Sequence, residues 1–140
     1  MATATDAELV MKLYDLRREP VMREARKFIL FQFKPQNHDE LYAVTRNQAV
    51  PENAYWRQVI SYWEMAATLA LRGAVDPELF LDWNGEGLVL YAKYHHWHAE
   101  SEKQSGQPFM RNTAALIERF PEAKARYEGI LSRFGPGSGR

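Results

Sequence analysis

The stretch PENAYWRQVISYWEMAATLALRG, residues 51–73, decides the fold of this chain. Pro51 suits the first position of a helix, where no backbone N–H is needed, and Gly73 suits the left-handed residue that closes one. Between them the sequence is apolar around most of the helical circumference. Its polar residues form one narrow stripe: Arg57, Ser61, Glu64, Thr68 and Arg72. Such a helix is largely buried, so we expect residues 51–72 to lie at the centre of a helical domain.

The rest of the chain also contains start and stop signals that are typical of helices. Thr5 with Glu8 predicts a capping box, and Pro20 predicts either a new helix or a kink in a long one. The stretch FILFQF, residues 28–33, continues a 3.6-residue pattern and indicates helix. Other boundaries are expected at Lys34-Pro35, Asn37 or Asp39, Asp76-Pro77, Asn84-Gly85, Ser105-Gly106, Pro108 or Asn112, and Pro121. The predicted fold class is therefore all-α, a compact single-domain array of about six or seven helices.

The composition limits the possible functions. Lys plus Arg equals Asp plus Glu at 18 each, which argues against a general binder of nucleic acid or anionic membranes. The absence of cysteine excludes disulfides, thiolate zinc sites and cysteine nucleophiles. The first residues do not form a signal peptide, and no apolar run approaches the ~20 residues of a membrane helix, so we expect a soluble, cytoplasmic protein. Residues 1–134 are expected to form the domain, and residues 135–140, GPGSGR, a flexible tail.

One expected helix, GEGLVLYAKYHHWHAESEKQ over residues 85–104, carries polar groups on its apolar face. His95, His98 and Glu102 are spaced three and four residues apart, which places them on one side of a continuous helix. They can hold zinc, iron or manganese if another helix supplies further ligands, first of all through Glu64 and otherwise through Asp82. The alternative, which we favour, is structural: pairing with arginine or backbone, or a self-association surface. His96 is expected to be solvated.

Glu64 also has two interpretations. Within a buried helix its carboxylate can have a shifted pKa and act as an acid or base. More often such a group pairs with an arginine, and this is our prediction.

Five basic residues, Arg17, Arg18, Arg23, Arg26 and Lys27, form a second candidate site. They can contact phosphate groups of a nucleic acid. Asp15, Glu19 and Glu24 are interleaved with them, so a solvated face of mixed charge is favoured. Trp56 and Trp63, seven residues apart, are expected in the core; we also expect Trp63 to be buried and Trp97 to be at least partly so.

The stretch YWEMAATLALRGAVDPELFLDWNGEG, residues 62–87, preceded by LRREPVMREARKFI, resembles an uncharacterised family of small bacterial helical proteins. In that family a helix with an embedded glutamate leads to G-x-[VI]-D-x-[ED]-L-[FV] and then to a helix bearing histidine or tryptophan. The family is a domain of unknown function. The resemblance implies a helical fold and a bacterial source, and no activity or site residue.

The sequence therefore favours a non-enzymatic domain that acts through protein contacts or self-association, as a homo-oligomer, without a cofactor and without catalytic residues. The first alternative is a small-ligand or metal-binding protein, a metal-dependent enzyme included, whose metal candidates are His95, His98, Glu102 and Glu64. The second is a regulator that contacts nucleic acid through the face from Arg17 to Lys27.

Overall fold

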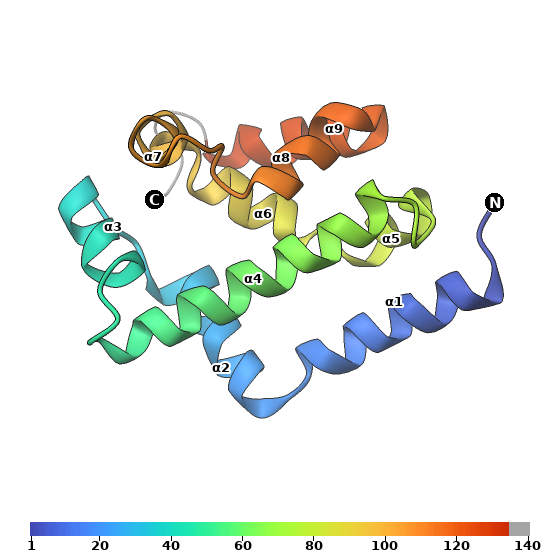
Figure 1. The fold of residues 1–140 in the computed structure, drawn as a ribbon, viewed down its shortest axis with the longest axis horizontal. Coiled ribbons are helices and arrows are strands. Elements are labelled where there is room, and N and C mark those ends of the chain that lie inside the picture. The colour runs from blue at the N-terminus through green and yellow to red at the C-terminus, as the bar shows by residue number, and fades with distance from the viewer. Residues whose placement is uncertain (135–140) are drawn as a thin grey trace.

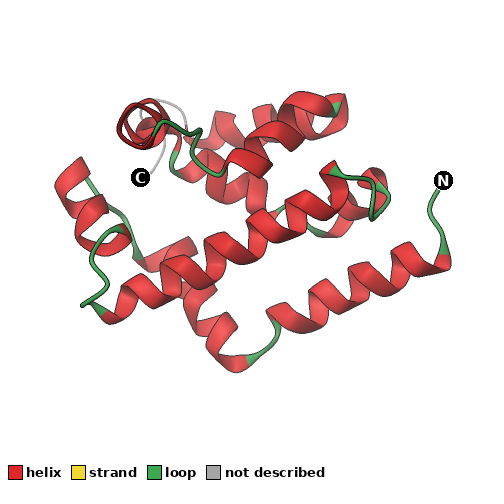
Figure 2. Ribbon diagram, in the orientation of Figure 1, coloured by secondary structure: helices red, strands yellow, loops and turns green. Residues whose placement is uncertain are grey.

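The computed structural model describes residues 1–134, and every regular element among them is helical (Figure 2). The α-helices are α1 (Ala4–Arg17), α2 (Pro20–Lys27), α3 (His38–Thr45), α4 (Pro51–Leu71), α5 (Pro77–Trp83), α6 (Glu86–Lys93), α7 (His98–Ser105), α8 (Arg111–Arg119) and α9 (Pro121–Leu131). Three short turns complete them: the π-helix η1 (Phe28–Gln32) and the 3₁₀-helices η2 (His95–Trp97) and η3 (Ser132–Phe134). The all-α prediction is confirmed. The predicted tail, residues 135–140, lies outside the described residues.

Helix α4 is central, as predicted. It runs through the middle of the molecule, with α6, α8 and α9 on one side and α1 and α2 on the other (Figure 1). Its buried face includes Val59, Trp63 and Ala66, each at most 1% exposed. Of the predicted polar stripe, Arg57, Ser61 and Arg72 are exposed, whereas Glu64 and Thr68 are half-buried. No helix within residues 1–134 is both long enough and apolar enough to span a membrane.

The C-terminus of α4 ends at the glycine that the sequence indicates. Gly73 has φ +78°, and its N–H donates to the carbonyl of Ala70, while the N–H of Ala74 donates to the carbonyl of Leu69. This pair of bonds is the Schellman arrangement, which satisfies two carbonyls left open by the helix end. It also turns Val75 back into the core, where this side chain is fully buried.

The predicted capping box at the N-terminus of α1 was wrong by two residues. The box is formed by Thr3 and Asp6 instead of Thr5 and Glu8. Asp6 also accepts a hydrogen bond from the N–H of Asp76, at 3.0 Å, just before α5. This contact between two distant segments favours the earlier box, because Asp6 then joins the start of α1 to Asp76, the N-cap residue of α5.

The segment after Pro20 differs from a regular helix at one point. Pro20 starts the new helix α2, which is the first of the two alternatives predicted from the sequence. Glu19 caps this helix by accepting from the N–H of Met22. The following stretch is helical but widens into the π-helix η1, where the N–H of Phe33 donates to the carbonyl of Phe28. The wider turn brings the rings of Phe28 and Phe33 into a stack, with centroids 5.4 Å apart.

Two predicted boundaries were wrong. Helix α8 starts at Arg111 and not at Pro108 or Asn112, after Met110 in a left-handed conformation with φ +46°. The single helix expected over residues 85–104 is broken into α6, η2 and α7. The second difference creates the candidate site.

Candidate ligand-binding cleft

The break after α6 is caused by Tyr94. This residue leaves the helical conformation, at φ −99° and ψ +21°, and its ring enters the core with 1% of its surface exposed. Its hydroxyl donates to the carbonyl of Ile29 at 3.1 Å, and its ring meets Trp56 edge-on at 5.2 Å. Burial raises the pKa of the Tyr94 hydroxyl well above its usual value, so the group remains a donor. In a continuous helix the backbone of Tyr94 would keep helical dihedral angles, and its side chain would point in a different direction.

The break also explains the contacts of two half-buried histidines, His95 and His98. The carbonyl of Ala92 accepts from Nδ1 of His95 at 2.8 Å, and the carbonyl of Tyr91 accepts from Nε2 of His98 at 2.8 Å. A carbonyl can only accept, so each of these ring nitrogens carries a proton. The histidines thus satisfy carbonyls near the end of α6. The favoured structural interpretation fits these contacts, with the backbone as the partner.

The metal candidates are dispersed in the structure. Glu102 is exposed on α7, and Asp82 pairs with Arg126 at 3.0 Å. Within the described part of the chain, no three His, Asp or Glu side chains are grouped so that they can hold a metal ion.

Glu64 is a helix cap and not the partner of an arginine, which corrects our prediction. Its two carboxylate oxygens accept from the backbone N–H groups of Asn112 and Thr113, each at 2.9 Å, and from the Thr113 hydroxyl at 2.8 Å. None of the ion pairs within residues 1–134 includes Glu64. The carboxylate therefore supplies the cap that α8 lacks in its own sequence, and it joins α8 to α4.

The basic face from Arg17 to Lys27 is partly turned inward. Arg26 makes a two-pronged ion pair with Glu86, at 2.7 and 2.9 Å, and the indole N–H of Trp63 donates to the same carboxylate. Arg17 donates to the carbonyl of Trp83 and lies over the Trp63 ring. Arg18, Arg23 and Lys27 remain exposed, so the surface available to a phosphate backbone is smaller than the sequence suggests.

A cleft of about 490 Å³ opens where η1 ends and η2 begins. We call it the basic cleft. Its lining residues are Leu30, Phe31, Lys34, Pro35, Gln36, Lys93, Tyr94, His95, His96, Trp97 and Phe134. None of these described lining residues is acidic, although the chain as a whole has equal numbers of acidic and basic residues.

Lys93, the last residue of α6, forms one wall of the basic cleft and joins α6 to η1. Its ammonium donates to the carbonyls of Ile29, Leu30 and Phe33, at 2.5, 3.3 and 2.7 Å, at the end of η1. Burial, together with the charge of Lys34, lowers the pKa of Lys93 to about 8. The protonated side chain has three N–H groups, one for each of these carbonyls, so the three hydrogen bonds hold the charged Lys93 in place.

The other polar groups of the basic cleft are less committed. His95 uses Nδ1 for the backbone, and its Nε2 has no hydrogen-bond partner among the described residues. Lys34 is exposed and takes part in none of the ion pairs formed within residues 1–134.

Aromatic rings line the rest of the basic cleft. Phe31 has 68% of its surface exposed. Trp97 is half-buried, as predicted, and its ring meets His38 of α3 edge-on at 4.8 Å. Phe31, Lys34 and Lys93 were not predicted as site residues from the sequence. The available signal for Lys93 was its place between apolar residues, three after Leu90 and four before Trp97.

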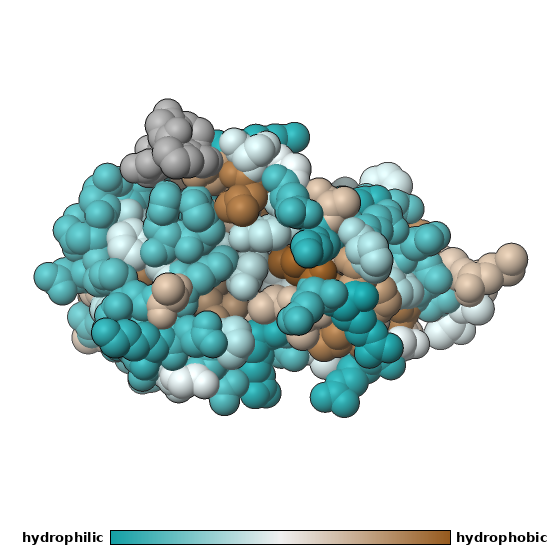
Figure 3. All heavy atoms as spheres, turned by 90° about the horizontal axis from the view of Figure 1, so that it is seen from above, coloured by the Kyte–Doolittle hydropathy of each residue, from teal (hydrophilic) through white to brown (hydrophobic). Residues whose placement is uncertain are grey.

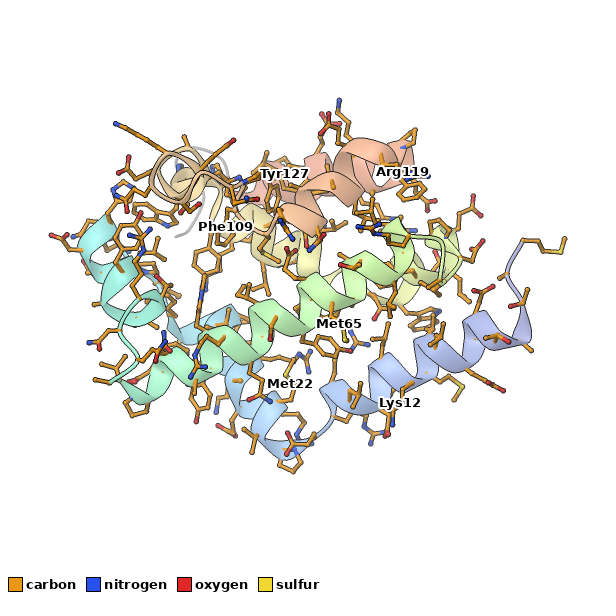
Figure 4. All side chains as sticks on the ribbon, in the orientation of Figure 1. Lys12, Met22, Met65, Phe109, Arg119 and Tyr127 are labelled. Carbon is orange, nitrogen blue, oxygen red and sulfur yellow. The ribbon has the colours of Figure 1, made fainter. Side chains whose placement is uncertain are left out.

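His98 lies on the inner side of this region, away from the lining of the basic cleft. Its ring stacks against Phe109 at 5.3 Å and lies 4.0 Å from the Tyr91 ring. Tyr91 in turn contacts Tyr127, and both Phe109 and Tyr127 lie on the α8–α9 side of the molecule (Figure 4). Burial lowers the pKa of His98 to about 4, so the imidazole is neutral at pH 7.

The sequence matches a family model over residues 2–120, which is most of the chain; the family is described as a domain of unknown function, DUF4760. The chain belongs to this family. The predicted resemblance to a domain of unknown function is thereby confirmed, and the DUF4760 region includes all of α1–α8 and every lining residue of the basic cleft except Phe134. No curated protein and no solved structure matches the chain.

Proposed function

We propose that this DUF4760 domain binds a small organic molecule in the basic cleft. The observation that carries the proposal is the cleft itself, about 490 Å³ in volume and lined by aromatic rings and ionisable groups. Ligand sites in proteins have volumes of about 300–1,000 Å³ and combine apolar walls with a few polar groups. The polar groups that stay uncommitted, Lys34 and Nε2 of His95, are of the kind that orients a ligand.

This proposal develops the small-ligand alternative without its metal. Within residues 1–134, no three His, Asp or Glu side chains are grouped so that they can hold a metal ion, so we propose an organic ligand for this site.

A fragment screen followed by ¹⁵N–¹H NMR tests the proposal. We expect fragments to shift amide signals of residues 28–36 and 93–97 with dissociation constants on the order of 0.1–1 mM, as is usual for ligands of about a dozen heavy atoms. Phe31→Ala removes an exposed wall of the cleft and should weaken binding. Met11→Ala, at a site that is 72% exposed on α1, is the matched control and should not. A screen without any fragment that maps to the cleft would refute the proposal.

A second candidate function is self-association through the N-terminal helices, and a specific observation favours it. Four large apolar side chains are exposed within eleven residues: Met11, Tyr14, Leu16 and Val21. Met11 and Tyr14 lie three residues apart on one face of α1. The other exposed large apolar side chains of the described chain, Met1, Phe31, Met65 and Trp83, are scattered along the sequence. The face seen in Figure 3 is mostly hydrophilic, with separate apolar areas.

Sedimentation velocity tests this second candidate. The double variant Met11→Lys and Tyr14→Lys should shift a dimer to monomer at micromolar concentration, whereas Glu118→Lys on the exposed side of α8 should leave it unchanged. A protein that sediments as a monomer up to about 100 μM would exclude a dimer with the micromolar affinity expected of a specific interface.

A further inference from the structure

We infer that the ligand of the basic cleft is a planar, apolar molecule with a single carboxylate group. The inference rests on the proposed function and names the ligand class of the same site. It follows from three features of the lining: the sign of its charges, the number of its available donors, and the aromatic character of its walls.

The charges of the basic cleft select an anion. Its ionisable lining residues are Lys34, Lys93, Tyr94, His95 and His96, and no Asp or Glu stands among the described lining residues. An aromatic pocket without such charges can hold an organic cation over its rings. Here the ammonium groups of Lys34 and Lys93 would repel that cation, so the same rings are better suited to an anion.

The number of available donors points to a monoanion and away from a phosphate. Lys93 already donates to three carbonyls, so it contributes charge but no spare hydrogen bond. Lys34 can donate directly, and so can the second N–H of the Gln36 amide, whose other N–H donates to the carbonyl of Lys34. Phosphate groups are usually held by several donors, often arginines or the N–H groups of a helix N-terminus. The described lining contains no arginine.

The aromatic and aliphatic walls of the basic cleft favour a ligand with a planar, apolar ring system. Phe31, with 68% of its surface exposed, and Trp97 provide aromatic rings, and Leu30 and Pro35 provide aliphatic surface. Covering the Phe31 ring with an aromatic ligand removes apolar surface from water. It also allows the offset stacking that aromatic pairs prefer.

Isothermal titration calorimetry with three matched probes tests the inference: 2-naphthoate, the uncharged 2-naphthalenemethanol, and 2-naphthyl phosphate. We expect 2-naphthoate to bind about tenfold more tightly than the alcohol, which corresponds to one favourable charged contact. The phosphate should bind no more tightly than the carboxylate. Lys34→Met should weaken 2-naphthoate about fivefold to tenfold and leave the alcohol unchanged.

Two further variants complete the design. Lys12→Met removes an exposed lysine from α1, which contributes no residue to the cleft (Figure 4), and should bind 2-naphthoate like the unmodified protein. His95→Asn retains an amide donor for the carbonyl of Ala92 and removes the ring from the wall of the cleft, so it should weaken 2-naphthoate and the alcohol alike without loss of folding.

The outcomes separate the two proposals. Equal binding of 2-naphthoate and the alcohol would overturn the carboxylate inference and leave the proposed function standing. Tighter binding of 2-naphthyl phosphate would replace the carboxylate by a phosphate and would also overturn it. If none of the probes binds, and the fragment screen also finds no ligand for the cleft, both proposals fail.

Discussion

Glu64 is a single side chain on which the packing of two helices depends. Its carboxylate accepts four hydrogen bonds from the first residues of α8, two from backbone N–H groups and two from side chains. The sequence marked Glu64 as a polar residue in an otherwise apolar helix. It could not name the partner, because Asn112 and Thr113 lie 48 and 49 residues away.

Glu64→Gln should therefore destabilise the protein by about 1–3 kcal/mol, since the amide nitrogen faces a donor and the negative charge at the helix N-terminus is lost. Glu118→Gln, on the exposed face of α8, is the control and should change the free energy of unfolding by less than about 0.5 kcal/mol. Urea denaturation measures both. Equal midpoints for the two variants would show that Glu64 does not cap α8.

His98 makes stability depend on pH. Its pKa is about 4 in the folded protein and about 6.5 in an unfolded chain. Between these values the unfolded state binds more protons, so stability is fully present above about pH 6.5 and decreases as the pH falls towards 4.

His98→Gln retains a donor for the carbonyl of Tyr91 and removes the titrating group. We expect the loss of stability between pH 7 and pH 4.5 to be smaller in this variant, although His38, His95 and His96 remain. Urea midpoints at the two pH values give the comparison. An unchanged pH dependence in the variant would mean that His98 is not neutral in the folded state.

At the scale of elements, the predictions that succeeded depended on proline and glycine. Pro20, Pro51, Pro77 and Pro121 each start a helix, and Gly73 ends α4. These residues act through their own backbone preferences, which a sequence displays directly.

The boundaries that failed have no such residue. Tyr94 ends α6 because its ring and hydroxyl find Trp56 and Ile29 in the core. Met110 precedes α8 in a left-handed conformation because Glu64 supplies the cap from another helix. Both causes are contacts between residues far apart in the chain, so local propensity could not reveal them.

The same substitution, glycine to alanine, at two positions tests whether α4 ends at Gly73. Gly73→Ala should cost about 1 kcal/mol, because φ is +78° and alanine is strained there. Gly129→Ala lies within α9, where an added Cβ meets no atom within 4 Å, and should stabilise the protein by up to about 1 kcal/mol. Thermal unfolding should therefore shift in opposite directions. Shifts of the same sign would contradict the assigned end of α4.

At the scale of the whole molecule, one ion pair holds several helices together. Glu86 at the start of α6 binds Arg26 of α2 and the indole N–H of Trp63 in α4. The side chains of Arg26 and Glu86 are 26% and 14% exposed, so the pair is shielded from water more than a surface pair. The hydrogen bond to Glu86 raises the pKa of Arg26 above its usual value.

Glu86→Ala should cost about 2–4 kcal/mol, because it leaves Arg26 as a partly buried charge without its partner. Glu122→Ala breaks the exposed pair with Arg126 and should cost less than about 1 kcal/mol. Chemical denaturation of both variants gives the contrast. If both cost the same, the Arg26–Glu86 pair does not connect the two sides of α4 as described.

The break at Tyr94 forms one side of the basic cleft, for which we propose a small aromatic acid as the ligand. Intermolecular nuclear Overhauser effects between 2-naphthoate and the protein test this proposal most directly, since they report proton pairs in close contact. We predict effects from the ligand to the ring protons of Phe31 and Trp97. Effects to Met11 and Tyr14 instead, or none to any residue at millimolar ligand, would contradict the account.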